Sequence, residues 1–387
     1  MIAQDKIRLE NQLLVEEAHS LLDAKFITED QFAIIKKLLP TPKRQKNILF
    51  RLGFLLLGML LYSSICGFLT LFGLGVLDNN FEMFLFIFAA VGFIGAEFFA
   101  RQNFLEHGLD DAFIIGGQLL LAGAIGTITN EFELVIAAVT TIVALLSYFR
   151  YINRASIIIF CFASTATIAY TMFEMGVVGK SILPFILMLY AIVCCFICVK
   201  ITINVQYPIC QKGLLLVKYY SLLLFYFSGN YLVVRELSVA LLGHEITANA
   251  DISFAWFFYI FTFIVPISYI FYGLKKLDRS FLWIGLLTFV FSLYSIDFYF
   301  LDIPAEIYLI TVGLLLFAIA YFSIKMLKDK KEGITFRPDR FINSNDFLHT
   351  EALILTSQFG LKPEATIDSP MEFGGGGFSG GGSTGGY

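Results

Sequence analysis

The sequence predicts an all-α protein: a polytopic transmembrane helix bundle of about ten spans, with short helical segments at both ends. The first observation is composition, because 58% of the residues are hydrophobic and only 15% are charged, whereas a soluble domain is about half apolar and a quarter charged. The second is clustering, because the apolar residues gather in runs long enough for a helix to cross about 30 Å of hydrocarbon. The net charge of −4 comes without a basic stripe, so the expected partner is the lipid bilayer and not nucleic acid.

Residues 1–47 are polar and predict a small helical hairpin on the cytoplasmic side. Thr28 is a favourable N-cap for the second helix, and Gln31 stands where the partner in a capping box belongs. Pro40 and Pro42 end that helix. The hairpin is too small for a large hydrophobic core of its own, so we expect it to pack against another surface.

The membrane domain is predicted to occupy residues 48–324. Five of the six cysteines fall inside its apolar runs and the sixth in a loop on the predicted cytoplasmic side, which argues against a disulfide framework. The ten predicted spans are 48–73, 81–100, 112–129, 132–149, 155–173, 181–199, 213–234, 252–274, 280–300 and 304–324.

Lysine and arginine predict that both termini lie in the cytoplasm, because positive charge gathers in the loops that stay inside. The N-terminal segment, the even-numbered connections and the tail carry most of these residues, and the opposite side has only Lys180 and Arg235. In the even-numbered connections they are Arg101, Arg150, Arg154, Lys200, Lys212, Lys275, Lys276 and Arg279.

Residues 325–370 form a predicted cytoplasmic segment that contains one amphipathic helix at about 344–359. Its apolar residues are too few to span a membrane, so we expect it to pack on the bundle, the hairpin or the membrane surface. Residues 371–387 are rich in glycine, and the conformational entropy of such a segment opposes a packed core. We therefore expect a disordered tail, with a free end and a docking or self-association tail both left open.

Four residues near the cytoplasmic ends of the spans form the candidate polar site: Glu97, Asp111, Gln118 and Lys218. A charge costs about 2.5–3.5 kcal/mol near a helix centre on insertion scales, and a pair of opposite charges costs less. We therefore expect Glu97 to pair with Lys218, with Gln118 nearby. Two interpretations stay open, a water-accessible cavity that faces the cytoplasm or a lysine that snorkels while the acids sit among headgroups.

A second polar zone lies toward the other face and consists of Asn230, Arg235 and Asp297. Pro266, in the middle of its span, predicts a kink and a freed carbonyl that another helix or water must satisfy. In the span 112–129, glycines predict a close approach to neighbouring helices. They are Gly116, Gly117, Gly123 and Gly126.

Two segments carry a resemblance to known proteins. Residues Leu13–Leu39, with their Phe-Ile-Thr-Glu-Asp-Gln turn, are similar to the short helical domain before the membrane body of bacterial proteins grouped as DUF2157 and DUF4401. The stretch HGLDDAFIIGGQLLL, residues 107–121, is similar to their first cytoplasmic loop and third span, and the glycine-rich end resembles tails on such proteins from Bacteroidota. The resemblance implies a bacterial inner-membrane location and no established activity, so it supplies no catalytic residues.

The sequence contains no complete catalytic or metal-binding motif. His244-Glu245 lacks the second histidine of a zinc protease, because Ala248 stands in its place. Cys195 and Cys198 form a CxxC pair, for which packing in a helix interface and metal or redox use both stay open. No cofactor is predicted.

Three classes of function remain. A transporter or permease with a cytoplasm-facing polar cavity fits the ten spans, the predicted kink and the paired polar zones. A non-catalytic sensor, scaffold or assembly factor fits the helical elements at both cytoplasmic ends, which would bind a protein partner. An enzyme that acts on lipids fits least, because no acid–base or metal constellation is visible.

Overall fold

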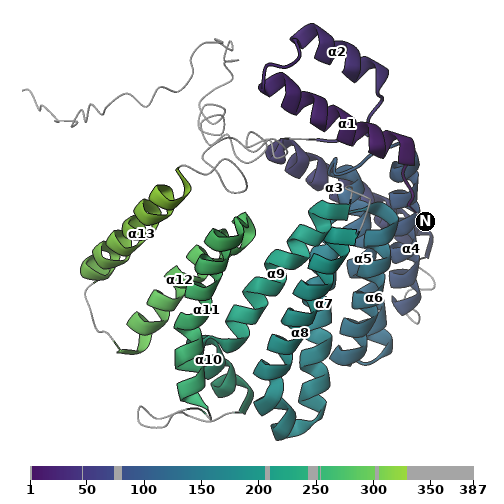
Figure 1. The fold of residues 1–387 in the computed structure, drawn as a ribbon. Helices are drawn as coiled ribbons and strands as arrows, with labels where there is room; N and C mark the ends of the chain where they lie inside the picture. The colour runs from purple at the N-terminus through teal and green to yellow at the C-terminus, as the bar shows by residue number, and fades with distance from the viewer. Residues whose placement is uncertain are drawn as a thin grey trace, which may run out of the picture. The chain divides into compact units, whose positions relative to one another are not determined.

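The computed structural model describes residues 2–45, 47–73, 81–204, 210–242, 252, 254–300 and 305–328. Within these residues the chain forms α-helices and no strand (Figure 1). They belong to one compact unit, Met1–Asn343, whereas the second unit, Ser344–Tyr387, lies outside the described residues. The predicted helix at 344–359 and the glycine-rich tail at 371–387 are therefore not described.

The N-terminal segment forms two helices, α1 (Lys6–Asp23) and α2 (Glu29–Leu38). The predicted capping box at the start of α2 is confirmed. The backbone N–H of Gln31 donates to the hydroxyl of Thr28 at 3.3 Å, and the backbone N–H of Thr28 donates to the Gln31 amide oxygen at 2.9 Å. The turn is thus fixed by contacts within four residues, which is why the sequence alone could locate it.

Among the described residues, seven helices are long and apolar enough to cross a membrane. They are α3 (Ile48–Gly73), α4 (Phe81–Arg101), α5 (Leu109–Ile128), α6 (Glu133–Tyr151), α7 (Arg154–Glu174), α8 (Gly176–Asn204) and α11 (Ala255–Lys276). The other helices of this region are α9 (Gln211–Gly229), α10 (Tyr231–Leu242), α12 (Arg279–Phe300) and α13 (Ala305–Leu327). The protein is therefore an all-helical membrane protein with several spans.

The predicted span 213–234 is wrong as a single helix. α9 ends at Gly229 and α10 begins at Tyr231, with Asn230 between them in an extended conformation (φ −74°, ψ 127°). The side-chain oxygen of Asn230 accepts the backbone N–H of Val233 at 3.2 Å. Asparagine is a preferred N-cap because this bond satisfies a donor at the helix start, so the residue ends one helix and begins another.

The N-terminal hairpin contacts one end of the bundle, which we call the hairpin end (Figure 1). The backbone N–H of Ala3 donates to the carbonyl of Arg150 at 2.8 Å. Lys43 pairs with the α4–α5 loop, because its N–H donates to Asn103 at 2.7 Å and its carbonyl accepts from Leu105 at 3.1 Å. The predicted basic connections that follow α4 and α6 therefore meet at this end, next to the hairpin.

Helices α3, α4 and α5 approach one another closely. A Cβ atom added at Gly92 would lie 2.5 Å from Cα of Gly117, and one at Gly116 would lie 2.3 Å from the ring of Tyr62. The predicted close approach is thus confirmed at Gly116 and Gly117, since any larger side chain would push the helices apart. It is wrong at Gly123, where a Cβ atom would meet nothing within 4 Å.

The later helices pack as two pairs, α8 along α9 and α11 along α12, and α9 also contacts α11 and α12. Pro266 lies inside α11, and the carbonyl of Thr262 that it leaves free accepts the hydroxyl of Ser292 at 2.6 Å. The predicted need for a donor from another helix is therefore confirmed, with α12 supplying it.

Candidate functional site

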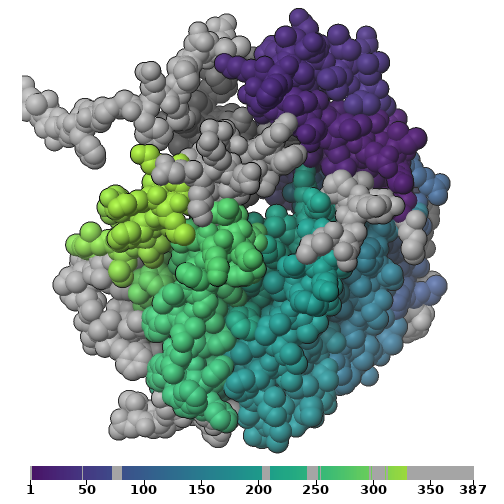
Figure 2. Space-filling model, in the orientation of Figure 1, coloured from purple at the N-terminus to yellow at the C-terminus, as the bar shows by residue number. Residues whose placement is uncertain are grey.

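A cavity of about 830 Å³ lies between the pair α8–α9 and the pair α11–α12. In Figure 2 the green surface of α11 and α12 meets the teal surface of α8 and α9. Along α9 the cavity reaches from Gln211, at the hairpin end, to Phe225, a distance of about 21 Å at 1.5 Å per residue. The described lining residues are Ala191, Ile192, Cys195, Phe196, Val199, Thr202, Gln211, Lys212, Leu214, Leu215, Lys218, Ser221, Leu222, Phe225, Tyr269, Tyr272, Asp278 and Phe281.

An ion pair joins the two walls of this cavity near the hairpin end. Nζ of Lys218, on α9, lies 2.6 Å from Oδ2 of Asp278, which precedes α12. The two side chains are only 16% and 29% exposed, and the ring of Phe281 lies 5.1 Å from the ammonium. The other carboxylate oxygen of Asp278 accepts the backbone N–H of Ser280 at 2.9 Å, so the acid is held in place by the start of α12.

Hydrogen bonds between buried side chains join α9, α11 and α12 beyond the other end of the cavity. The Tyr226 and Ser292 hydroxyls lie 2.8 Å apart. The amide of Asn230 donates to Tyr226 at 2.8 Å and to Ser295 at 3.2 Å. The backbone N–H of Tyr231 donates to the hydroxyl of Thr262 at 3.0 Å. We call Tyr226, Asn230, Thr262, Ser292 and Ser295 the far seam, which joins α9, α11 and α12 where α9 ends.

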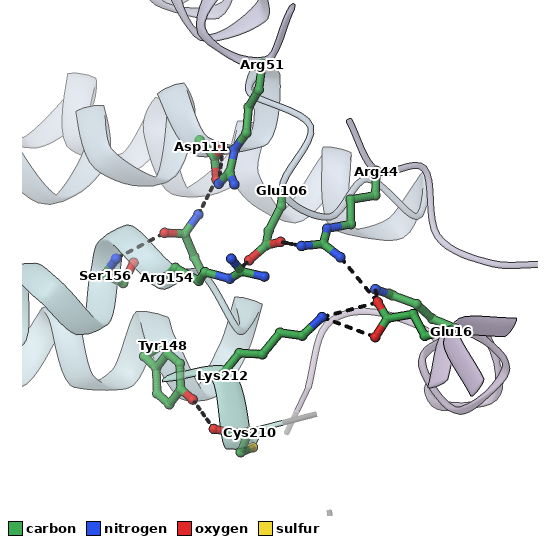
Figure 3. A network of polar contacts seen from close by, with 12 residues as sticks. Glu16, Arg44, Arg51, Glu106, Asp111, Tyr148, Arg154, Ser156, Cys210 and Lys212 are labelled. Atoms are coloured by element: carbon green, nitrogen blue, oxygen red, sulfur yellow. Dashed lines mark hydrogen bonds and ion pairs between the residues drawn. The ribbon is translucent and has the colours of Figure 1, made fainter. Parts of the chain in front are cut away.

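A network of ion pairs ties the N-terminal hairpin to the bundle (Figure 3). Glu16, on α1, lies 3.2 Å from Nζ of Lys212 and 3.3 Å from Nη1 of Arg44. Nη2 of Arg44 lies 2.7 Å from Glu106, and Arg154 contacts the other oxygen of the same carboxylate. Because Lys212 also lines the cavity, the hairpin is connected to the helix that forms one cavity wall.

A second polar chain runs through α3, α5 and α7. Figure 3 shows its part from Arg51 through Asp111 to Ser156. Asp111 lies 2.7 Å from Nη2 of Arg51 and accepts the amide of Asn153 at 2.5 Å. Asn153 in turn accepts the backbone N–H of Ser156 at 3.0 Å and so caps α7. The amide of Gln118 donates to the hydroxyl of Ser156 at 2.8 Å. These hydrogen bonds and the ion pair bind three helices together, and among the described residues the side-chain oxygen of Gln118 is buried without a hydrogen-bond partner.

Glu16 is held in its charged form by the contacts of the hairpin network. Burial raises the pKa of this carboxyl, but the hydrogen bond from Gln12 and the charges of Lys212 and Arg44 outweigh burial. The pKa of Glu16 therefore lies below its ordinary value of 4.5. The link between hairpin and bundle is ionic at neutral pH.

His107 occupies the α4–α5 loop between two aromatic rings. Its ring centroid lies 4.4 Å from that of Phe54 and 4.9 Å from that of Phe104. Burial lowers the pKa of His107 below 6.5, and the nearby charge of Asp111 opposes that shift only in part. The imidazole is therefore neutral at pH 7 and packs as an aromatic ring.

The predicted pair between Glu97 and Lys218 is wrong. Oε1 of Glu97 lies 2.6 Å from Nη2 of Arg150, and Lys218 pairs with Asp278. The amide of Gln118 binds Ser156, and Asp111 binds Arg51. The physical reason is packing: α4 lies against α3 and α5, whereas α9 lies against α7, α8, α10, α11 and α12.

The predicted zone toward the other face is described in part. Asn230 is fully buried in the far seam. Nη1 of Arg235 donates to the hydroxyl of Tyr231 at 3.2 Å, and Tyr231 is the residue that follows Asn230. The side chain of Asp297 lies outside the described residues.

Asp278 was not predicted from the sequence, because it lies in a connection and not inside a predicted span. A local signal exists, since an aspartate directly before the apolar run of α12 is a typical helix N-cap. That signal identifies the helix start and not the partner, because Lys218 is 60 residues away. Glu16 and Arg44 were missed for the same reason.

Three or more His, Cys, Asp or Glu side chains do not gather into a metal-binding group anywhere in the described part of the chain. All six cysteines are free. Cys198 is buried among Tyr148, Cys161 and Val217, and Cys195 lines the cavity. In these surroundings Cys198 acts as a small apolar side chain.

Comparisons of the chain with family models, curated proteins and solved structures find no match. The resemblance of residues 13–39 and 107–121 to DUF2157 and DUF4401 proteins stays a prediction.

Proposed function

We propose that this membrane protein is a permease-like transporter whose cavity faces the cytoplasm. The observation that carries the proposal is the cavity of about 830 Å³ between two helix pairs, with an ion pair toward one end and the far seam beyond the other. Access from one side only is expected for one state of a transporter that alternates between two openings. A helix interrupted beside buried polar groups, such as α9–α10 at Asn230, is also typical of transporters.

The orientation belongs to the same proposal. The hairpin end, with its arginines and lysines, faces the cytoplasm of a bacterial inner membrane, and α9, α12 and α13 complete ten spans. Reporter fusions after Asn130 and Gly179 should then report the outside, and fusions after Asn153 and Lys276 the inside. A fusion after Asn153 or Lys276 that reports the outside contradicts this orientation.

The transport step would be a rocking motion of the α8–α9 pair against the α11–α12 pair. The hydrogen bonds and ion pairs between the pairs lie at three levels, which are the ion pair Lys218–Asp278, the bond from the Tyr269 hydroxyl to the carbonyl of Leu222 at 3.1 Å, and the far seam. Opening the seam while the hairpin end closes would expose the same cavity to the other side. The buried hydroxyl and amide groups of the seam can exchange protein partners for water as it opens.

The test uses a single cysteine at Ser221, which lines the cavity, in a variant whose other cysteines are replaced. For a transporter, a membrane-impermeant maleimide should label Ser221→Cys from both sides. A disulfide across the seam, made from Asn230→Cys and Ser295→Cys, should stop labelling from the far side and leave labelling from the hairpin side. Ser181→Cys, an exposed position on α8, is the matched control that the disulfide should not affect. Labelling of Ser221→Cys from the hairpin side alone, with or without the disulfide, identifies a fixed pocket and sinks the transport proposal.

The second candidate is a non-catalytic scaffold or sensor that works through its cytoplasmic ends. It is favoured by α2, which has no buried residue. Phe26 and Leu38 are 75% and 73% exposed, and Ile34 is also exposed. A partner that co-purifies with the wild type and with Lys36→Glu, but is lost with Ile34→Glu, would support this candidate.

A further inference from the structure

The cavity opens sideways as well as toward the hairpin end. Ile192 and Phe196 line it, yet they are 52% and 60% exposed on the surface of α8, a helix long and apolar enough to span the membrane. An opening bordered by such side chains faces the acyl chains of the bilayer. A molecule can therefore enter from the membrane with an apolar tail, and the volume is in the range of sites for drug-sized ligands, about 300–1,000 Å³.

The charged groups of the cavity restrict the head of such a molecule. Among the described lining residues the charged ones are Lys212, Lys218 and Asp278. Lys212 is engaged by Glu16 of the hairpin, with 3.2 Å to each carboxylate oxygen. The cavity therefore offers one ammonium and one carboxylate, which already neutralise each other at 2.6 Å.

A ligand with a single charge leaves one member of this pair unpaired. An anion that binds Lys218 leaves the Asp278 carboxylate unpaired, and a cation that binds Asp278 leaves the Lys218 ammonium unpaired. A stranded charge that is only 16% or 29% exposed is costly, because breaking a sheltered ion pair loses the attraction without restoring full hydration. A head with both charges instead gives each residue a new partner.

We propose that the cavity binds a zwitterionic single-chain amphiphile from the adjacent leaflet, with a phosphate and an ammonium in its head. The phosphate binds Lys218, which has N–H groups to spare beyond the one that meets Asp278. The ammonium binds Asp278 beside the ring of Phe281, whose face attracts cations. The acyl chain lies along the apolar wall that ends at Phe225. This inference names the ligand class of the proposed transport cavity and rests on that proposal for its biological role.

The test measures binding of three amphiphiles, each with one oleoyl or oleyl chain, to the full-length protein in maltoside micelles. They are lysophosphatidylethanolamine, which is zwitterionic, lysophosphatidylglycerol, which is anionic, and oleyltrimethylammonium, which is cationic. We expect the zwitterion to bind at least ten-fold more tightly than either of the others. Equal or tighter binding of the anion or the cation overturns the proposal.

Two variants locate the site. Asp278→Asn should shift the preference toward the anion, and Lys218→Met should shift it toward the cation, because each leaves one charge. Lys276→Met, an exposed lysine outside the cavity, is the matched control and should keep the wild-type order. Because the two variants shift the preference in opposite directions, a variant that fails to fold does not remove the test. A folded variant that keeps the wild-type order places the amphiphile elsewhere and refutes the site.

A last experiment tests whether the ligand is a membrane lipid or a soluble molecule with the same head. O-phosphoethanolamine, which has the same head without a chain, should not displace the zwitterionic lysolipid at 100-fold excess. Displacement would show that the head alone is recognised and would overturn the lipid source. The two proposals can be refuted independently. A pocket that is labelled only from the hairpin side refutes transport, but it can still bind amphiphiles with this charge selectivity.

Discussion

The two halves of the bundle use buried polar groups in different ways. In α3–α7 the polar chain from Arg51 through Asp111 to Gln118 joins three helices, and the glycine contacts at Gly92 and Gly117 bring helices close together. In α8–α12 the polar contacts between the helix pairs border a cavity, and they are the Lys218–Asp278 pair, the bond from the Tyr269 hydroxyl to the carbonyl of Leu222, and the far seam. The first half has the features of a rigid platform, and the second those of two walls that can move.

The N-terminal hairpin connects both halves. Arg44 and Glu106 fasten it beside the platform, and Glu16 fastens it to Lys212 on the cavity wall. A change at the hairpin can therefore reach the mouth of the cavity through one ion pair. The difference shows two uses of a few buried polar residues. A continuous chain of hydrogen bonds holds helices in one arrangement, whereas polar contacts separated by a cavity leave the helix pairs able to move. Four measurements test this contrast.

The largest expected effect is at Asp111. Asp111→Asn leaves Arg51 without its charge partner in a buried setting and should destabilise the protein by about 3 kcal/mol. Asp278→Asn, in the other half, leaves the sheltered Lys218 without its partner and should cost about 2 kcal/mol. The loss is smaller than at Asp111 because Asp111 also binds Asn153. Thermal unfolding midpoints in detergent measure both, with Glu10→Gln on the exposed face of α1 as the control. Equal losses at the two aspartates would contradict the contrast between the halves.

Glycine packing gives the next effect. Gly92→Ala places a methyl group 2.5 Å from Cα of Gly117 and should cost about 1–3 kcal/mol, because the helices must separate. Gly123→Ala, on the same helix as Gly117, meets nothing within 4 Å and should change stability by about 0.5 kcal/mol at most. The same unfolding measurement applies. A neutral Gly92→Ala would show that α4 and α5 are not rigidly held.

The far seam should respond more weakly. Ser292→Ala removes the donor to the carbonyl freed by Pro266 and should cost about 1–2 kcal/mol. Ser181→Ala, whose hydroxyl bonds within its own exposed helix turn, serves as the matched control with little effect. We also expect faster labelling of Ser221→Cys from the far side when Ser292→Ala is added. Unchanged labelling would show that the far seam does not control access to the cavity from the far side.

The hairpin contact should give the smallest effect and a pH dependence. Because the pKa of Glu16 is lowered from 4.5 in the folded protein, its contribution is fully present above that value and is lost as the pH falls below it. Glu16→Gln should mimic acid at neutral pH and speed hydrogen exchange of the α1 amides about five-fold, a change of about 1 kcal/mol. Glu17→Gln, its exposed neighbour, should leave exchange unchanged. Slow α1 exchange in Glu16→Gln at pH 7 would mean that other contacts hold the hairpin.

His107 makes a second contribution to the pH dependence of stability, and it also lowers stability as the pH falls. Its pKa is lowered from 6.5 in the folded state by burial, so the unfolded chain takes up a proton first as the pH falls. Stability is therefore lost below about pH 6.5, and His107→Phe should flatten that part of the profile.

The sequence by itself determined whatever depends on neighbouring residues or on composition. The apolar runs identified a helical membrane protein, and the Thr28–Gln31 pair located the start of α2. Pro266 predicted a backbone carbonyl that requires a hydrogen-bond donor from elsewhere. Each of these follows from contacts within about one helical turn, or from the cost of placing a backbone group in lipid without a partner.

Only the tertiary structure decided which helices are neighbours. Glu97 meets Arg150 across 53 residues, and Lys218 meets Asp278 across 60, although depth in the membrane alone suggested that Glu97 and Lys218 would meet each other. Depth fixes the level of a charge, but its partner at that level depends on how helices pack side by side. That packing is set by side-chain shapes such as those at Gly92 and Tyr62, which no local pattern encodes.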